Sequence, residues 1–198
     1  MCSRETDKFA STTLFRGGYS FRHGMKIDTL AVHAGSDVDP DTGAVVPPIH
    51  LSTTFEHGPA GEETHGYSYI REKNPTQSRL EQALAQLDSG EAGAVFSSGM
   101  AAGVAVLQTM PLGSHVVFPD DIYVTFRRLS HDFLPKWGIQ STAIDMQNHA
   151  ELKAAIRPNT RLVWVETPSN PLMKILDIKA VSEIAHASRS KRVMDRLP

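Results

Sequence analysis

The sequence predicts an α/β domain in which a mostly parallel sheet carries helices on both faces. Short apolar segments alternate with helical segments from residue 92 to residue 187, and this alternation is typical of crossover units between parallel strands. The strongest predicted strand, 161–165, contains the continuous run Leu-Val-Trp-Val, as expected for a strand buried on both faces. With 40% hydrophobic and 21% charged residues among 198, the composition is that of a globular protein.

The elements before residue 92 are less regular. Residues 27–65 show no sustained helical period and are punctuated by Gly and Pro, which favours an extended arm with loops. A helix is predicted to begin at Asn74, because Asn is a good cap and Pro75 suits a first helical turn, and to end before Gly90. Its predicted apolar face consists of Leu80, Ala83, Leu84 and Leu87.

The alternating region then follows in order. Strands are predicted at 92–97, 114–118, 140–144 and 161–165, and helices at 100–110, 123–137, 150–156 and 177–187. The next strand is due after residue 187, but three of the five residues in 188–192 are basic, whereas a central parallel strand is nearly all apolar. We therefore expect the sheet to be truncated at this point.

These patterns divide the chain into four parts. Residues 1–24 have no usable period, and we expect an unstructured upstream extension before a start at Met25, with a transit peptide as the alternative. The extended arm and loops occupy 25–65, the main domain 66–187, and an aberrant tail 188–198.

Several classes of protein are excluded by composition. A net charge of −2 provides no general attraction for nucleic acid or anionic membranes, and no apolar run reaches the ~18 residues of a membrane span. The single cysteine, Cys2, indicates a reducing compartment, most simply the cytoplasm. The histidine spacing predicts no metal site, and the glycine fingerprints of dinucleotide and nucleoside-triphosphate sites are absent.

Candidate binding residues follow three predicted strands, where ligands of parallel α/β sheets bind. Ser98-Gly99-Met100 forms a strand-to-helix turn whose amides can bind a single phosphate, although a tight turn without a ligand has the same pattern. Tyr123 can stack on a flat heteroaromatic ligand, or lie half-buried at a helix start. Asn170 stands in a proline-stiffened turn that is either a ligand-binding loop or a stiff surface loop.

A second phosphate clamp is predicted upstream. Tyr69 and Arg71 are two residues apart, so in an extended segment they lie on the same side. A phenol and a guanidinium side by side suit a phosphate, and the alternative is a solvated loop ahead of a helix.

In their order these motifs resemble one known family over about residues 27–186. The motifs are Thr29-Leu-Ala-Val-His-Ala-Gly35, Asp41-Thr-Gly-Ala-Val, Ser52-Thr-Thr-Phe55, Tyr69-x-Arg71-x-x-Asn-Pro-Thr76, Ser98-Gly-Met-Ala-Ala102, Asp120-Asp-Ile-Tyr123 and Glu166-Thr-Pro-Ser-Asn-Pro171. They resemble the amino-terminal half of the Cys/Met-metabolism (transsulfuration) family of pyridoxal-phosphate (PLP) enzymes. The resemblance implies a fold-type-I PLP enzyme, with 66–187 as part of its PLP-binding large domain.

The resemblance also implies roles for single residues. Gly99 and Met100 would bind the phosphate of pyridoxal 5′-phosphate through their amides, while Tyr69 and Arg71 would clamp that phosphate in a neighbouring subunit, within a dimer of dimers. Tyr123 would stack on the pyridine ring and assist proton movements, and Asn170 would lie near the ring's phenolic oxygen and the substrate carboxylate. The chain departs from the family at Val124-Thr125-Phe126, where Gly-Gly-Thr is common.

By this resemblance the reaction is β- or γ-elimination or γ-replacement on a cystathionine-, cysteine- or homoserine-type substrate. The family's Schiff-base lysine follows a Ser/Thr-rich loop that this sequence does not contain, so we expect the chain alone to be an inactive fragment. The alternative is a non-catalytic partner that co-assembles with full-length subunits. Asp195 lies at about the family's distance for the aspartate paired with the pyridine nitrogen, but its neighbours are basic.

Overall fold

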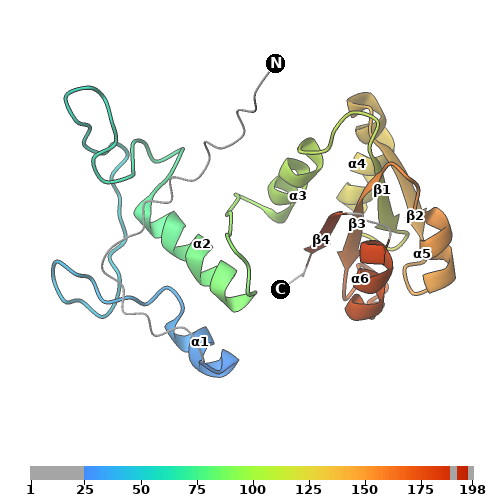
Figure 1. The fold of residues 1–198 in the computed structure, drawn as a ribbon, viewed down its shortest axis with the longest axis horizontal. Coiled ribbons are helices and arrows are strands. Elements are labelled where there is room, and N and C mark those ends of the chain that lie inside the picture. The colour runs from blue at the N-terminus through green and yellow to red at the C-terminus, as the bar shows by residue number, and fades with distance from the viewer. Residues whose placement is uncertain (1–24, 188–190, 196–198) are drawn as a thin grey trace, which may run out of the picture. The chain divides into compact units, whose positions relative to one another are not determined.

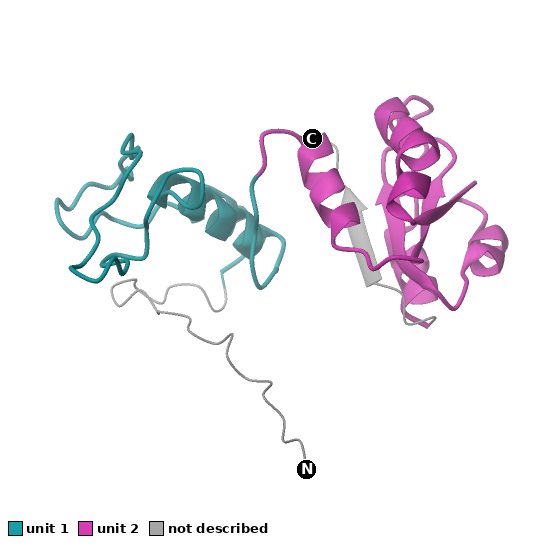
Figure 2. Ribbon diagram, turned by 90° about the horizontal axis from the view of Figure 1, so that it is seen from above, with its two compact units in different colours: residues 1–95 teal, residues 96–198 magenta. Residues whose placement is uncertain are grey.

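The computed structural model describes residues 25–187 and 191–195. The chain separates into two compact units, residues 1–95 and residues 96–198, hereafter unit 1 and unit 2 (Figure 2). The predicted upstream extension, 1–24, lies outside the described residues, as do 188–190 and 196–198 of the predicted tail.

The described part of unit 1, residues 25–95, contains two helices joined by a long loop region. Helix α2 (Pro75–Leu87) confirms the predicted start, since the Asn74 side chain caps it by accepting a hydrogen bond from the Thr76 N–H at 2.9 Å. Helix α1 (Ile27–His33) corrects the prediction of an arm without helices. It has seven residues and buries none of them, so it leaves no apolar period in the sequence.

Unit 2 is an α/β domain around a parallel sheet. Its described strands are β1 (His115–Pro119), β2 (Gln140–Ile144), β3 (Thr160–Glu166) and β4 (Lys191–Asp195), in the order β2-β1-β3-β4 (Figure 1). The helices are α3 (Gly99–Gln108), α4 (Val124–Asp132), a 3₁₀ turn η1 (Leu134–Trp137), α5 (His149–Ala155) and α6 (Ile178–Ala187). The predicted sheet and its crossover helices are therefore confirmed.

Two apolar clusters cover the two faces of this sheet. Side chains alternate along β1, where Val116 and Phe118 pack with α3, α4 and η1, while Val117 packs with α5 and α6. Strand β3 alternates in the same way, with Trp164 on the first side and Val165 on the second. Helices thus lie on both faces, as the continuous apolar runs predicted.

Three other predictions about elements need correction. No strand forms at 92–97, because none of the described strands pairs with that segment. The helix predicted for 123–137 is interrupted at Phe133, since Pro135 has no N–H to continue the helical hydrogen bonds.

The sheet also continues past residue 187, where its end was predicted. Strand β4 pairs in parallel with β3, and the register joins Leu162 to Lys191 and Glu166 to Asp195. Because β4 is the outer strand among those described, its basic sequence is compatible with pairing on one side.

Candidate functional site

The start of α3 presents backbone amides at the turn predicted to bind a phosphate. Ser98 caps the helix, its Oγ accepting a hydrogen bond from the Ala101 N–H at 3.1 Å. The first N–H groups of an α-helix have no partner within the helix, so those of Gly99 and Met100 are available to an anion. A Cβ placed on Gly99 would meet nothing within 4 Å, which shows open space above this turn.

Gly103 fixes the position of α3 on the sheet. A Cβ at Gly103 would lie 2.2 Å from Cζ of Phe126 and 2.9 Å from Cη2 of Trp164, so only glycine permits this close approach. The aromatic rings occupy the space that the missing side chain leaves, with their centroids 4.6 Å apart. The Phe126 that departs from the family pattern is therefore a buried core residue of α4.

This contact brings three candidate segments to one edge of the sheet. Helix α3 leads into β1 through a short connection, so its C-terminal end lies near the start of β1 and its first turn at the carboxyl edge. Phe126 follows Tyr123 by three residues, and Trp164 precedes Glu166 by two. The turn at Gly99, the start of α4 and the end of β3 therefore face the same end of unit 2.

Tyr123 lies at this edge with its ring accessible. It is the N-cap residue of α4 and 39% exposed. Its backbone N–H points toward Oε2 of Glu166 at 3.4 Å, and Glu166 is fully buried at the end of β3. This contact links the segment after β1 to the segment after β3, and it leaves the phenol free to face a ligand.

Asn170 lies on the exposed part of the loop that follows β3. The buried carboxylate of Asp121 holds this loop by accepting hydrogen bonds from Ser169 Oγ and from the Leu172 N–H, the latter at 3.1 Å. The structure thus brings Asn170 and Tyr123 onto two segments that are hydrogen-bonded to each other.

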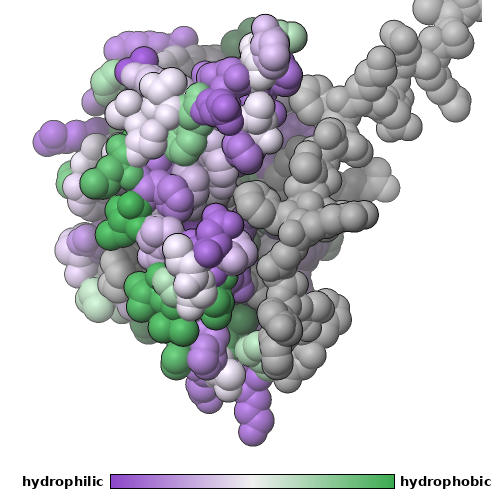
Figure 3. All heavy atoms as spheres, turned by 90° about the vertical axis from the view of Figure 1, so that its left-hand side faces the viewer, coloured by the Kyte–Doolittle hydropathy of each residue, from purple (hydrophilic) through white to green (hydrophobic). Residues whose placement is uncertain are grey.

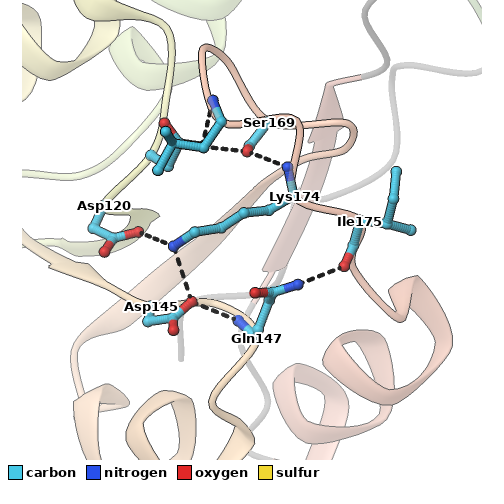
Figure 4. Close-up of polar contacts among 8 residues, drawn as sticks. Asp120, Asp145, Gln147, Ser169, Lys174 and Ile175 are labelled. Carbon is cyan, nitrogen blue, oxygen red and sulfur yellow. Dashed lines mark hydrogen bonds and ion pairs between the residues drawn. The ribbon is translucent and has the colours of Figure 1, made fainter.

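Lys174 is the charged group of this loop that the sequence analysis did not single out. Its Nζ lies 3.4 Å from Oδ1 of Asp120 and 3.3 Å from Oδ1 of Asp145 (Figure 4). Burial lowers the pKa of Lys174, but the hydrogen bonds to Asp145 and Asp120 outweigh it and raise the pKa above its ordinary value. The sequence signal was an aspartate within two residues of the end of each of two predicted strands, 114–118 and 140–144, and two such carboxylates at one edge of a sheet indicate a nearby cation.

Tyr69 and Arg71 lie side by side, but a turn at residues 70–72 brings them together, and the predicted extended segment is wrong. The guanidinium carbon of Arg71 lies 4.4 Å from the centre of the Tyr69 ring, a cation–π contact. Tyr69 forms an isolated antiparallel bridge with Thr54, and the chain turns directly after it, since the Tyr69 carbonyl accepts hydrogen bonds from the Glu72 N–H at 2.9 Å and the Lys73 N–H at 3.1 Å. Both residues belong to unit 1, whereas Gly99, Met100, Tyr123 and Asn170 belong to unit 2.

The other end of the sheet carries a buried histidine. His115 begins β1, and its ring nitrogens lie 2.8 Å from Thr160 Oγ1 and 2.9 Å from Thr142 Oγ1. Burial, and secondarily the charge of Arg157, lowers the pKa of His115 to about 4, so the ring is neutral at pH 7. His115 therefore joins three strands at the edge opposite the candidate site.

Within the described ranges, no group of three or more His, Cys, Asp or Glu side chains could hold a metal ion. None of the helices described is both long enough and apolar enough to cross a membrane. A cavity of about 310 Å³ runs along α2, bordered by Glu81 and Gln82 among others, and it contains none of the predicted site residues.

Comparison with known proteins gives a consistent result. The family described as Cys/Met metabolism PLP-dependent enzyme matches residues 28–196. The chain is 43% identical over 171 residues to cystathionine gamma-lyase of Bacillus subtilis, covering 86% of this chain and 45% of that enzyme. It is 40% identical over 169 residues to cystathionine beta-lyase of Lactococcus lactis subsp. cremoris, covering 85% of this chain and 44% of that enzyme.

Solved structures show the same similarity. The structure of metB from Corynebacterium glutamicum matches with a TM-score of 0.81 and 39% identity, over 87% of this chain and 45% of that one. Cystathionine gamma-lyase of Lactobacillus plantarum, solved with L-serine, matches with a TM-score of 0.80 and 36% identity, over 86% of this chain and 44% of that one. The chain thus spans somewhat less than half the length of these relatives.

Proposed function

The chain belongs to the Cys/Met-metabolism family of PLP-dependent enzymes, and on this premise we propose that unit 2 binds pyridoxal 5′-phosphate for transsulfuration-type chemistry. The observation that carries the proposal is the first turn of α3, where capped helix geometry, a glycine and open space coincide. Unpaired amides at a helix start favour a phosphate through both hydrogen bonding and the helix dipole.

The residues around this turn fit such a cofactor. Gly99 and Met100 would donate their N–H groups to the phosphate, and the space above Gly99 gives the phosphate room to approach the backbone. The accessible ring of Tyr123 would stack on the pyridine ring. Asn170 would contact the phenolic oxygen of the ring and the substrate carboxylate from the exposed loop after β3.

Strand β4 supports a further candidate for the pyridine nitrogen. Its register places Asp195 beside Glu166, at the carboxyl end of β3. The family match extends through residue 196 and so includes Asp195. We therefore include Asp195 among the residues proposed to bind the cofactor.

Tyr69 and Arg71 would complete the phosphate site of a second subunit. Their contact already forms a compact cationic group within unit 1. The surface of unit 1 also carries many exposed apolar side chains, including Val45, Val46 and Leu51 (Figure 3). Exposed apolar surface of this kind marks interaction sites, which supports a homo-oligomer in which these residues serve a neighbouring site.

The proposed reaction is β- or γ-elimination or γ-replacement on a cystathionine-, cysteine- or homoserine-type substrate, in the cytoplasm. Bound PLP supplies the electron sink at the amino-acid α-carbon. Tyr123 would hold or move a proton at its phenolic oxygen, next to the ring it covers. No lysine of the 198-residue sequence follows a Ser/Thr-rich loop, and we therefore propose that this chain tested alone binds the cofactor without turnover.

Binding can be measured by calorimetric titration with pyridoxine 5′-phosphate, which has no aldehyde to react with surface lysines. We expect saturable binding that inorganic phosphate competes away. Gly99→Val should weaken it by roughly tenfold, because the new side chain fills the open space above the amides. Ala150→Val, in the exposed first turn of α5, is the matched control and should bind normally. If the unmodified chain shows no saturable binding, the proposal is wrong.

A second candidate function is that of a non-catalytic partner of full-length subunits. The exposed apolar side chains of unit 1 and the Tyr69–Arg71 pair favour it, since both would be used on a neighbouring chain. Co-expression with a full-length family member, followed by size-exclusion chromatography, separates the two candidates. A shared peak supports the partner role, and separate elution contradicts it.

A further inference from the structure

We propose that Lys174 is a positioning residue, which holds the loop carrying Asn170 against the segment carrying Tyr123 so that both can face the cofactor ring. This inference rests on the proposed function, because it concerns the ring side of the same site. Lys174 itself is assigned no contact with the cofactor.

Hydrogen bonds join the two sides of the loop after β3 at two points along its length. At its base, Thr167 Oγ1 accepts a hydrogen bond from the Leu176 N–H at 3.1 Å. Further out, the Ser169 N–H donates to the Lys174 carbonyl at 3.0 Å, and the Lys174 N–H donates to Ser169 Oγ at 2.9 Å. The backbone of Lys174 is thus one side of a narrow loop with Asn170 in its tip.

Apolar packing does not fix this tip. Leu172, Met173 and Ile175 are each about two-thirds exposed, at 66%, 65% and 66%. A segment without buried apolar side chains is held only by its polar contacts. The position of Asn170 therefore depends on the hydrogen bonds and ion pairs that tie the loop to the rest of unit 2.

Those ties reach the ends of two other strands (Figure 4). Asp120 directly follows β1 and Asp145 directly follows β2, and Lys174 Nζ contacts both carboxylates. Gln147 adds a parallel tie, its Nε2 donating to the Ile175 carbonyl at 3.1 Å. Asp120 also begins the segment that leads to Tyr123, so the ammonium group of Lys174 connects the Asn170 loop to the Tyr123 segment directly.

Charge explains why this position requires a cation. One oxygen of each carboxylate lies within 3.4 Å of the same nitrogen, and the two negative groups are close together because β1 and β2 pair up to Pro119 and Ile144. Without the ammonium group the carboxylates repel each other, and the loop loses its attraction to both strand ends. Because the side chain of Lys174 is 23% exposed, solvent screens these interactions only in part.

The test compares Lys174→Met with Lys174→Arg in the full chain. Two probes are titrated, pyridoxine 5′-phosphate and inorganic phosphate, and the melting temperature of each variant is recorded. We expect Lys174→Met to bind pyridoxine 5′-phosphate roughly tenfold more weakly while its phosphate affinity is unchanged, because the α3 turn lies outside the Lys174 contacts. Lys174→Arg, which keeps the charge, should restore most of the ring-dependent affinity.

Lys153→Met, on the exposed side of α5, is the matched control and should change neither affinity. A purely structural role for Lys174 predicts instead that both probes weaken together with the melting temperature, and this result would overturn the inference. Equal pyridoxine 5′-phosphate affinity in Lys174→Met and the parent chain would also overturn it. If the parent chain binds neither probe, the proposed function fails before the role of Lys174 is reached.

If Lys174→Met does not fold, Asp145→Asn provides the second variant, since Lys174 keeps its contact with Asp120 there. We expect a smaller loss of the same ring-dependent affinity. Unchanged affinity in a folded Asp145→Asn variant would contradict the bridging role.

Discussion

The two units of the chain differ sharply in how they are stabilised. Unit 2 has apolar clusters on both faces of its sheet, including the fully buried Leu107 and Leu152. In the described part of unit 1, only Tyr67, Asn74 and Ser78 are buried, while Leu80 and Leu84 on the predicted apolar face of α2 are nearly half exposed. The comparison teaches that unit 2 contains its own core, whereas unit 1 has apolar surface suited to another protein surface.

The largest expected effect comes from truncating one leucine in each unit. Leu107→Ala should lower the free energy of unfolding by about 3 kcal/mol, because it opens a cavity beneath α3. Leu80→Ala should cost less than about 0.5 kcal/mol in dilute solution, since its side chain is 48% exposed. Urea unfolding followed by tryptophan fluorescence measures the first variant, because Trp137 and Trp164 both belong to unit 2. Hydrogen exchange in α2 measures the second, and equal costs would show that the surface of unit 1 is covered in solution.

A second prediction concerns the close packing of α3 in unit 2. Gly103→Ala should destabilise the chain by about 2 kcal/mol, because the added methyl group overlaps the ring of Phe126. Phe126→Leu in the same chain should recover part of this loss by removing the ring. If the double variant is no more stable than Gly103→Ala alone, overlap with the Phe126 ring is not the cause of the destabilisation.

The buried histidine predicts a pH dependence specific to unit 2. The pKa of His115 is about 4 in the folded chain, below the ordinary 6.5, so the unfolded chain binds more protons between these values. Its contribution to stability is complete above pH ~6.5 and is lost as the pH falls toward 4, on the order of 2 kcal/mol. Urea unfolding at several pH values should show a flatter profile for His115→Gln than for the parent chain. If both chains lose the same stability as the pH falls from 6.5 to 4, His115 is not the source of the pH dependence.

The smallest effect compares two helix caps. Asn148 caps α5 in unit 2 and Asn74 caps α2 in unit 1, each through its side-chain oxygen. Asn148→Ala should lower the global stability of unit 2 by about 1 kcal/mol. Asn74→Ala should instead speed hydrogen exchange in α2 and leave the unfolding of unit 2 unchanged, because the two caps belong to separate units. If Asn74→Ala lowers the global stability as much as Asn148→Ala does, the two units unfold together.

Local signals predicted much of the fold and the candidate site. The continuous apolar run of β3 and the Asn74-Pro75 start of α2 each fix an element within a few residues, and both were confirmed. The Ser98-Gly99 turn was likewise visible, since capping residues and a glycine before an apolar helix need no distant partner. Tyr69 and Arg71 were also expected side by side, although a turn and not an extended segment produces their contact.

Elements that need a distant partner were predicted less well. Residues 92–97 have the composition of a strand but pair with none of the described strands, while β4 has a basic sequence and forms because β3 has a free edge beside it. A strand exists only when another strand satisfies its backbone hydrogen bonds, and this partner is not part of the segment itself.

The sequence by itself thus determined the parallel α/β architecture, the family and the order of the candidate site motifs, because these depend on residue patterns within short segments. Tertiary structure alone decided that Lys174 lies between Asp120 and Asp145, and that Gly103 makes room for Phe126. Residues so far apart in sequence meet only when strand order and helix packing bring them together, and that arrangement minimises the energy of the whole domain.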